Sequence, residues 1–444
     1  METDLGILVF LVFGRWSLVF GFPHIVMLNL FQHLSIYHKI LKQVQNDVLL
    51  GFGRWSLVFG FPHIVMLNLF QHLSIYREIL KRVQNDAIFH LPKIHYLCTM
   101  KVDYIVVGLG LAGLCFIEEL KKANKSFVVF ENSSQKSSKV AAGMFNPVVL
   151  KRFTPVWNGK EQLDYALPFF KKLESQFNKK YIHDIAIYRV FKSVEEQNNW
   201  YAASDKPIMS HYITTPILSN DNKHIIAPFG FGKLTNTGKV DVNSLLLDYK
   251  TDLKSKNVLL EQTFEYQLLK NEETLNYKDI IAERIVFCEG YGLKGNPFFK
   301  ELPMNEAKGE LLTIHAPELK INFLLKAAVF VLPLGDDLYK VGATFNWKDK
   351  TQQPTKAGEM ELLMKLDMTI DSPYTIVAHE AGIRPTIKDR RPLVGTFQEN
   401  KNIAILNGLG TRGVMIGPTM AQQLFNHLEF DLPLDKEVDI RRFF

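Results

Sequence analysis

The amino-acid sequence predicts an α/β protein, α+β overall, in which a discontinuous α/β domain carries a second domain rich in antiparallel strands. Three observations lead to this expectation. A buried strand, a glycine-rich turn, a helix and a second strand follow one another within 104–131. A strand, a glycine-rich turn and a helical pattern recur at 403–428. Several short β-type segments, separated by turn residues, lie between these two regions.

The first region, 104–113, reads YIVVGLGLAG, a buried-strand run that leads directly into G-x-G-x-x-G. Gly108 allows the tight turn, Gly110 lets the backbone approach a pyrophosphate, and Gly113 lets the helix pack on the strand. The next apolar run ends in Glu131, whose carboxylate would accept hydrogen bonds from a ribose hydroxyl. This order predicts a Rossmann-like dinucleotide-binding unit; the alternative is a glycine-rich turn in another kind of α/β protein.

The remaining elements follow from hydrophobic periodicity and from Gly and Pro breaks. Segment 138–147 is expected to be a loop that enters a helix. Helices are expected over 162–177, over 240–253 with Asp241 as N-cap, and over 418–428 with Pro418 at an early helical position. Strands are expected at 185–191, 285–288, 309–314, 327–334, 338–343, 374–378 and 403–406.

These elements divide into two domains, for which 444 residues are sufficient. We expect the cofactor-binding domain to contain 100–180, 233–300 and 376–444. The substrate domain is then expected to contain 181–232 and 301–375.

Composition excludes several classes of protein. The chain has 52 basic and 46 acidic residues, a net charge of +6, and no polybasic tail, so charge gives no reason to expect a DNA partner. The three cysteines, Cys98, Cys115 and Cys288, have no metal-like spacing, and no metal site is expected. So few cysteines favour a reducing cytoplasm over a disulfide scaffold.

The first 99 residues contain a near-identical tandem repeat. Residues 13–47 recur at 52–86, and only three positions differ: His38/Arg77, Lys39/Glu78 and Gln43/Arg82. Stacking structural repeats conserve mainly the packing face, whereas this repeat is conserved on every face. Because Met100 stands just before the first predicted strand, we expect 1–99 to lie outside the fold, as translated repetitive DNA or the result of a mis-set start.

The alternative interpretation of 1–99 is attachment to a membrane surface. Apolar residues at helical spacing over 36–44 would suit two amphipathic hairpins lying on a bilayer. The apolar runs are too short to span one, and the segment lacks a basic start and a small-residue cleavage site. A membrane role is therefore the less favoured expectation.

Taken together, four separated motifs resemble the FAD-dependent D-amino acid oxidase superfamily, and are nearest to its glycine oxidase-like members. The motifs are VVGLGLAG (106–113) with Glu131, SKVAAGM (138–144), IVFCEG (285–290), and GIRPTIKDRRPLVG (382–395) followed by NGLGTRGVMIGP (407–418). Their order and spacing cover nearly the whole region from 102 to 428.

The resemblance implies FAD as a cofactor, with no motif for covalent attachment. The helix near Pro418 would direct its N-terminus at the flavin and stabilise the anionic reduced ring. The residues that the resemblance assigns to FAD are Gly108, Gly110, Leu111, Ala112, Gly113, Glu131, Ala141, Ala142, Gly143, Met144, Gly290, Gly410, Gly413, Val414 and Met415.

The resemblance also implies oxidation of a C–N bond. A neutral amine or amino acid gives hydride to flavin N5, the imine hydrolyses, and O2 or another acceptor reoxidises the flavin. Arg384 would hold the substrate carboxylate and Arg412 would lie near the same pocket; alternatively, these arginines form structural salt bridges or contact FAD phosphates. His379 is expected to be a strand histidine and Asp389 a turn residue, rather than catalytic groups.

Two departures from the family pattern leave other functions open. Phe330 stands where glycine oxidase-like enzymes tend to have tyrosine, which removes one hydrogen bond to a small polar substrate. Phe145-Asn146-Pro147 is closer to the flavin domain of the tRNA wobble-uridine modification enzyme, which oxidises a carboxymethylamine on tRNA. The alternatives are therefore that tRNA-modifying flavoenzyme, with tRNA as a less favoured partner, and a non-catalytic flavin-binding protein.

Overall fold

The computed structural model describes residues 8–13, 16–21, 99–271 and 274–444. The chain divides into two compact units, 1–96 and 97–444. Within the first unit, β1 (Leu8–Phe13) and β2 (Trp16–Gly21) pair antiparallel. Most of the tandem repeat and the amphipathic pattern at 36–44 lie outside the described residues.

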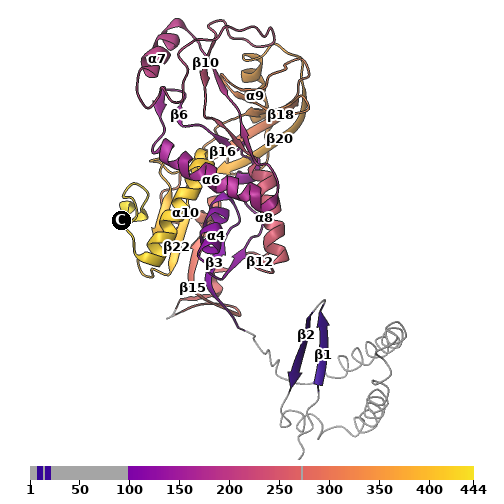
Figure 1. Ribbon diagram of the computed structural model, residues 1–444, viewed down its shortest axis with the longest axis vertical. Coiled ribbons are helices and arrows are strands. Elements are labelled where there is room, and N and C mark those ends of the chain that lie inside the picture. The colour runs from indigo at the N-terminus through magenta and orange to yellow at the C-terminus, as the bar shows by residue number, and fades with distance from the viewer. Residues whose placement is uncertain (1–7, 14–15, 22–98, 272–273) are drawn as a thin grey trace, which may run out of the picture. The chain divides into compact units, whose positions relative to one another are not determined.

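The second unit contains an eight-stranded sheet whose centre is parallel (Figure 1). Its buried strands follow the order β12-β4-β3-β15-β22, all parallel, and the antiparallel strands β14, β13 and β21 extend it. The bounds are β3 (Met100–Val107), β4 (Phe127–Phe130), β12 (Leu259–Leu260), β13 (Leu269–Asn271), β14 (Leu275–Tyr277), β15 (Ile280–Phe287), β21 (Leu393–Thr396) and β22 (Ile403–Asn407).

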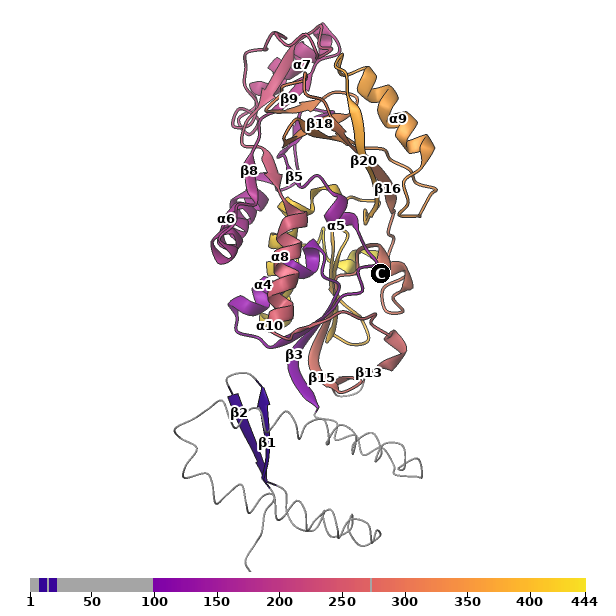
Figure 2. The same ribbon diagram turned by 90° about the vertical axis from the view of Figure 1, so that its right-hand side faces the viewer.

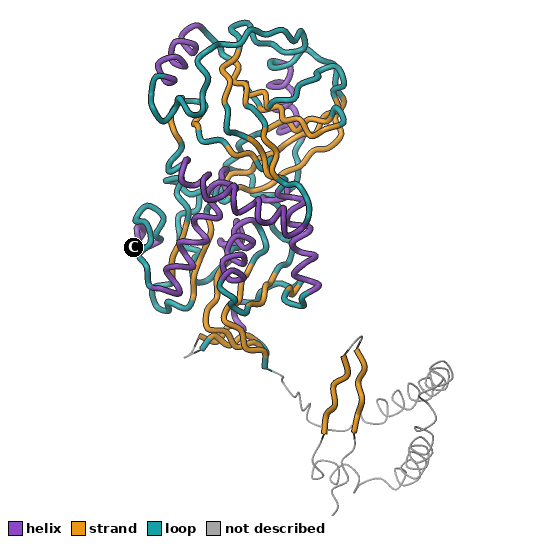
Figure 3. Tube along the Cα trace, viewed as in Figure 1, coloured by secondary structure: helices purple, strands orange, loops and turns teal. Residues whose placement is uncertain are grey.

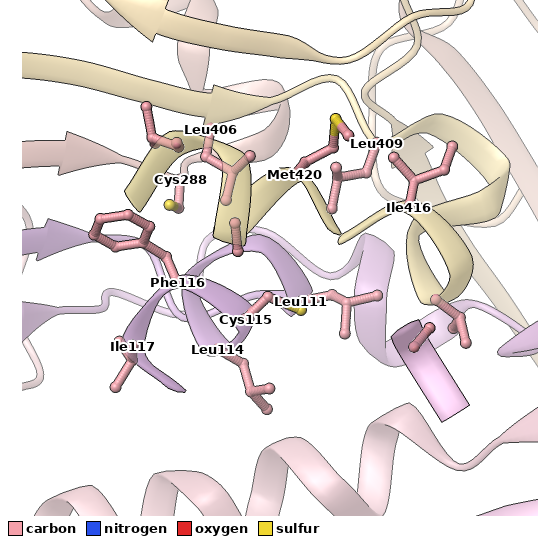
Figure 4. Close-up of a cluster of buried hydrophobic side chains, with 14 of the residues drawn as sticks. Leu111, Leu114, Cys115, Phe116, Ile117, Cys288, Leu406, Leu409, Ile416 and Met420 are labelled. Carbon is pink, nitrogen blue, oxygen red and sulfur yellow. The ribbon is translucent and has the colours of Figure 1, made fainter. Parts of the chain in front are cut away.

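Helices gather on one face of this sheet (Figure 3). They are α4 (Leu111–Lys122), α6 (Gly159–Phe177), α8 (Val242–Ser255) and α10 (Gly413–Phe430). Figure 4 shows how apolar side chains of α4 meet those of α10 and of the β15 and β22 ends, where Phe116 and Met420 are almost fully buried. Helix α4 is therefore held between the sheet and α10, with its N-terminus at the carboxyl end of β3.

A seven-stranded sheet forms the other layer of the unit (Figure 2). Its order is β10-β9-β17-β18-β19-β16-β20, and every pair is antiparallel except β17 with β9. The bounds are β9 (Ile187–Val190), β10 (Phe231–Leu234), β16 (Ala307–His315), β17 (Leu324–Lys326), β18 (Phe330–Gly335), β19 (Leu338–Gly342) and β20 (Thr375–Arg384), with helices α7 (Val194–Ser204) and α9 (Lys356–Asp367).

Small elements connect the two layers. A three-stranded sheet has the order β5 (Met144–Phe145), β11 (Gly238–Val240) and β8 (Ile182–Asp184), and β6 (Val148–Val149) pairs with β7 (Thr154–Pro155). No helix among the described residues is both long and apolar enough to span a bilayer.

The predicted α/β fold class is confirmed, and so is the helix capped by Asp241, whose side chain accepts from the N–H of Ser244 at 3.1 Å. The start of the last helix is predicted wrongly. Helix α10 begins at Gly413, and Pro418 lies inside it. Packing against α4 and α6 keeps the turns before the proline helical, although Pro418 cannot donate to the carbonyl of Val414.

Two further local predictions differ from the structure. Residues 138–147 contain the short helix α5 (Ser137–Val140) and strand β5, not a loop that enters a helix. Strand β20 is ten residues long and belongs to the seven-stranded sheet, so 376–384 lies with the substrate-side strands and not with the cofactor-side segment to which the sequence assigned it. Continuous pairing with β16 keeps β20 extended through its Gly and polar residues.

Candidate active site

A cavity of about 960 Å³ runs between the two sheets of the second unit. One wall is formed by the carboxyl ends of β3, β4 and β15 together with the N-termini of α4 and α10. The opposite wall is one face of the seven-stranded sheet, including Ile187, Leu311, Leu324 and Phe330. In open α/β sheets, ligands bind at this carboxyl edge.

Close backbone packing explains two glycines of the first motif. Gly108 has φ +101°, and a Cβ there would lie 2.6 Å from the carbonyl oxygen of Cys288. A Cβ at Gly113 would lie 2.0 Å from the carbonyl oxygen of Gly108, so α4 packs directly on the turn. The first-turn N–H groups of α4 have no intrahelical acceptors and face the cavity, where they suit an anion.

The carboxylate of Glu131 lies beside this turn, at the end of β4. Its two oxygens accept from the N–H of Leu109 at 2.6 Å and from the N–H of Ser133 at 2.5 Å. The acid that the sequence paired with the glycines is thus brought next to them and lines the cavity.

The second motif lies against the same helix N-terminus. The hydroxyl of Ser138 accepts from the N–H of Leu111 at 3.2 Å, and the hydroxyl of Ser137 donates to the carbonyl of Ile383 on β20. Ala141 to Met144 follow α5 along the cavity wall. Helix α5 therefore joins the glycine turn to the seven-stranded sheet.

Glu289 is a buried acid in the cavity wall, which the sequence gave no reason to select. Its carboxylate accepts from the hydroxyl of Tyr266 and from the amide of Asn296 at 2.7 Å. Burial raises the pKa of Glu289, and the two donors partly offset that effect. Gly290, which follows it, has φ +56° and also lines the cavity.

Arg384 ends β20 and directs its guanidinium across β16 into the cavity. A Cβ at Gly309 would lie 2.0 Å from Nη2 of Arg384, so only glycine leaves room for this guanidinium. Nη1 donates to the carbonyl of Thr344 at 3.2 Å, and the guanidinium carbon lies 4.3 Å from the ring centre of Phe345. Burial lowers the pKa of Arg384 to about 10, and no carboxylate among the described residues pairs with it.

Arg412 stands between the short 3₁₀ turn Gly410–Arg412 and the start of α10. Burial lowers its pKa, and the positive charge of Arg390 lowers it further. Within the described part of the chain, the Arg412 side chain makes no hydrogen bond or ion pair. The cavity thus receives two buried arginines without counterions.

The cavity wall contains all but two of the site residues selected from the sequence. Gly113 and Met415 do not line it: Gly113 is used for packing, and Met415 is fully buried in the core beneath α10. The selected residues that line it are Gly108, Gly110, Leu111, Ala112, Glu131, Ala141, Ala142, Gly143, Met144, Gly290, Arg384, Gly410, Arg412, Gly413 and Val414.

His379 and Asp389 lie outside the cavity wall, as expected. His379 Nε2 is 2.8 Å from Glu310 Oε2, close but not directed as a hydrogen bond, on the far side of β16 and β20. The carboxylate of Asp389 accepts from Nε of Arg442 at 2.9 Å. Sequence reasoning missed Gly309, Phe345 and Lys326, because only the pairing of distant strands brings them to the site.

The cavity fits a flavin dinucleotide on its own geometry. The Gly108 turn and the α4 N-terminus can hold a pyrophosphate, and Glu131 can hold a ribose. Small side chains at 141–143 leave room for a planar ring near the N-terminus of α10, whose positive dipole end favours negative charge on that ring.

The family described as "DAO: FAD dependent oxidoreductase" matches residues 103–426, well over half of the chain. The chain belongs to this family. The resemblance seen in the four motifs is confirmed, and FAD is the cofactor of the site.

Individual relatives are distant but cover most of the second unit. The chain is 22% identical to glycine oxidase of Bacillus subtilis (strain 168) over 370 residues, which are 77% of this chain and 95% of that protein. The solved glycine oxidase from Geobacillus kaustophilus superposes with TM-score 0.65 at 18% identity, covering 78% of this chain and 98% of that one. The tRNA 5-methylaminomethyl-2-thiouridine biosynthesis bifunctional protein MnmC of Azoarcus sp. is 25% identical over 175 residues, 34% of this chain and 28% of that protein.

Proposed function

We propose that this DAO-family flavoprotein oxidises the C–N bond of an amino acid or secondary amine that carries a carboxylate. The observation that supports this most directly is Arg384, a buried, unpaired guanidinium in the wall of the cofactor cavity. Burying a cation without a counterion is costly, so the site favours an anionic ligand. Bound FAD supplies the hydride acceptor, flavin N5.

Arg384 fixes the orientation of the substrate. A guanidinium binds a carboxylate through two parallel hydrogen bonds, which fixes the α-carbon in distance and in angle. Thr344 and Phe345 hold the guanidinium from one side, and Gly309 leaves the other side open. Arg412 adds a second positive charge to the same cavity and stabilises the bound carboxylate electrostatically.

The apolar wall keeps water from the reacting carbon. Leu311, Leu324 and Phe330 line the substrate side, and Phe330 offers no hydroxyl to the amine. No histidine or aspartate lines the described cavity, so the chain supplies neither as an acid–base group there. The substrate amine is therefore bound as the neutral base, and O2 or another acceptor removes the electrons afterwards.

The test is anaerobic bleaching of the flavin by amines. Among amino acids and N-alkyl glycines, only a substrate reduces the cofactor. Arg384→Ala should retain FAD and weaken carboxylate substrates by roughly 30-fold or more, since truncating one partner of a buried charge pair costs at least about 2 kcal/mol. Arg441→Ala, at an exposed arginine outside the cavity, is the control. Unchanged kinetics in Arg384→Ala would remove this residue from the proposal.

A second candidate is the same oxidation on a carboxymethylamine attached to tRNA. The similarity to the tRNA-modifying bifunctional protein over 175 residues favours it. Incubation with tRNA that carries the carboxymethylamine distinguishes the two. Flavin reduction by that tRNA, with none by free amines, would replace the small-molecule proposal.

A further inference from the structure

Lys326 is a cation in the cavity wall that the proposed chemistry does not use. It ends β17, where it pairs with Arg189 of β9 and with Phe330 of β18. Like its strand neighbours Leu324 and Ile187, it lies on the face of the sheet that lines the cavity or borders it. Within the described residues, its Nζ makes no hydrogen bond and no ion pair.

The surroundings of Lys326 are positively charged. Arg189 is paired with Glu196 at 3.0 Å and Lys365 with Glu361 at 2.5 Å, so these two cations already have partners. Burial lowers the pKa of Lys326 to about 8, and the nearby charges of Arg189, Lys365 and Lys192 lower it further within that shift. The ammonium of Lys326 therefore lacks any compensating charge of its own.

The cavity provides no counterion for this end. The acidic residues that line it are Glu131 and Glu289. Glu131 is bound to the backbone beside the glycine turn, and Glu289 is bound to Tyr266 and Asn296. Both lie on the dinucleotide side, so an anion that neutralises Lys326 has to come from a ligand.

The separation of Lys326 from Arg384 defines the shape of such a ligand. The guanidinium of Arg384 lies over Gly309 on β16, and β17 is three strands away through β18 and β19. At about 4.8 Å per strand this is roughly 14 Å along the sheet, less the inward reach of the two side chains. Phe330 and Leu311 cover the sheet between them and form an apolar floor.

We propose that Lys326 forms a second anion-binding site, so that the preferred substrate is an amine with two acidic groups separated by an apolar segment. One carboxylate, next to the amine, binds Arg384. The second acidic group, a carboxylate or a phosphate, binds Lys326. The assignment of the amine rests on the proposed function, whereas the two-anion geometry rests only on the cavity.

Ligand binding tests the geometry without turnover. The FAD-loaded protein is titrated with dicarboxylates from glutarate to sebacate, with monocarboxylates of matched length, and with ω-phosphono carboxylates, and binding is followed by the change in the flavin absorption. One dicarboxylate length should bind about tenfold or more tightly than its matched monocarboxylate, as expected for one added charge-assisted contact. The phosphono series shows which acidic group Lys326 prefers.

Variants assign the effect to Lys326. Lys326→Met should abolish the preference for two acidic groups and change monocarboxylate binding by less than about twofold, whereas Lys326→Arg should retain the preference. Lys356→Met removes the same charge from a lysine whose side chain is 76% exposed, and should change neither value. Equal binding of mono- and dicarboxylates at every length, or a preference that persists in Lys326→Met, overturns the inference.

Reduction of the flavin by amines separates this inference from the proposed function. If sarcosine bleaches the flavin but dicarboxylates show no preference, the second anion site is refuted and the amine oxidation stands. If the preference depends on Lys326 but no amine bleaches the flavin, the anion site stands and the amine oxidation is refuted.

Discussion

Replacing Gly309 by alanine tests whether the position of the Arg384 guanidinium determines substrate affinity. The added Cβ would lie 2.0 Å from Nη2, 2.1 Å from Cζ and 2.2 Å from Nη1 of Arg384. Since non-bonded heavy atoms stay about 3.5 Å apart, the guanidinium must move by roughly 1.5 Å. It is the far end of a flexible side chain, so it moves while the backbone of β16 and β20 stays in place.

The magnitude follows from the bonds that this displacement breaks. Arg384 keeps its charge but loses its alignment with the substrate carboxylate. A hydrogen bond to a charged group contributes about 1.5–3 kcal/mol, so losing one bond of the bidentate pair should raise the Kd of a carboxylate ligand roughly 10- to 150-fold. Arg384→Ala sets the upper limit of the effect.

The assay is titration of the purified flavoprotein with a monocarboxylate, followed by the flavin absorption, with FAD content and circular dichroism as checks of folding. Gly295→Ala is the matched control, because no atom lies within 4 Å of its added Cβ. The double variant should bind no more weakly than Arg384→Ala alone, since both changes remove one interaction. An unchanged Kd in folded Gly309→Ala, or additive effects, would refute the reasoning.

Three further predictions concern the cofactor turn, pH and the repeat segment. Gly113→Ala should lower FAD content and Tm, because its Cβ would lie 2.0 Å from the backbone oxygen of Gly108; full FAD loading at an unchanged Tm would contradict this. Dicarboxylate affinity should fall as pH rises through about 8, because the pKa of Lys326 is lowered to about 8 and only its protonated form attracts an anion, while monocarboxylate affinity stays level from about pH 6 to 9; parallel profiles would argue against it. A protein that starts at Met100 should fold and bind FAD like the full chain, as measured by flavin content and Tm, and loss of folding would show that 1–99 is required.

Local signals made the cofactor side predictable from the sequence. The strand, glycine turn and acid at 104–131 are contiguous, and the role of Gly113 in packing follows from its place in the motif. The Asp241 N-cap is equally local, because its acceptor oxygen and the N–H of Ser244 are three residues apart. Such features depend on neighbouring residues, and a single sequence contains them.

Non-local pairing made the substrate side less predictable. The expected strand at 374–378 ended too early, because the pairing of β20 with β16, and not its own composition, extends it to Arg384. Lys326 and Gly309 carry no local signal, and their importance follows only from the strand order that places both beside one cavity. Likewise, packing of α10 against α4 decided that the helix begins before Pro418.

The division of the second unit into two separately hydrogen-bonded sheets has a consequence for how new specificities arise. Phe330, Leu311 and Lys326 belong to strands paired only within the seven-stranded sheet, whereas the glycine turn belongs to the other sheet. Substitutions on the substrate face therefore leave the backbone that holds the dinucleotide untouched. A lineage with this architecture can exchange one amine substrate for another through a few side-chain changes while it inherits the same redox chemistry.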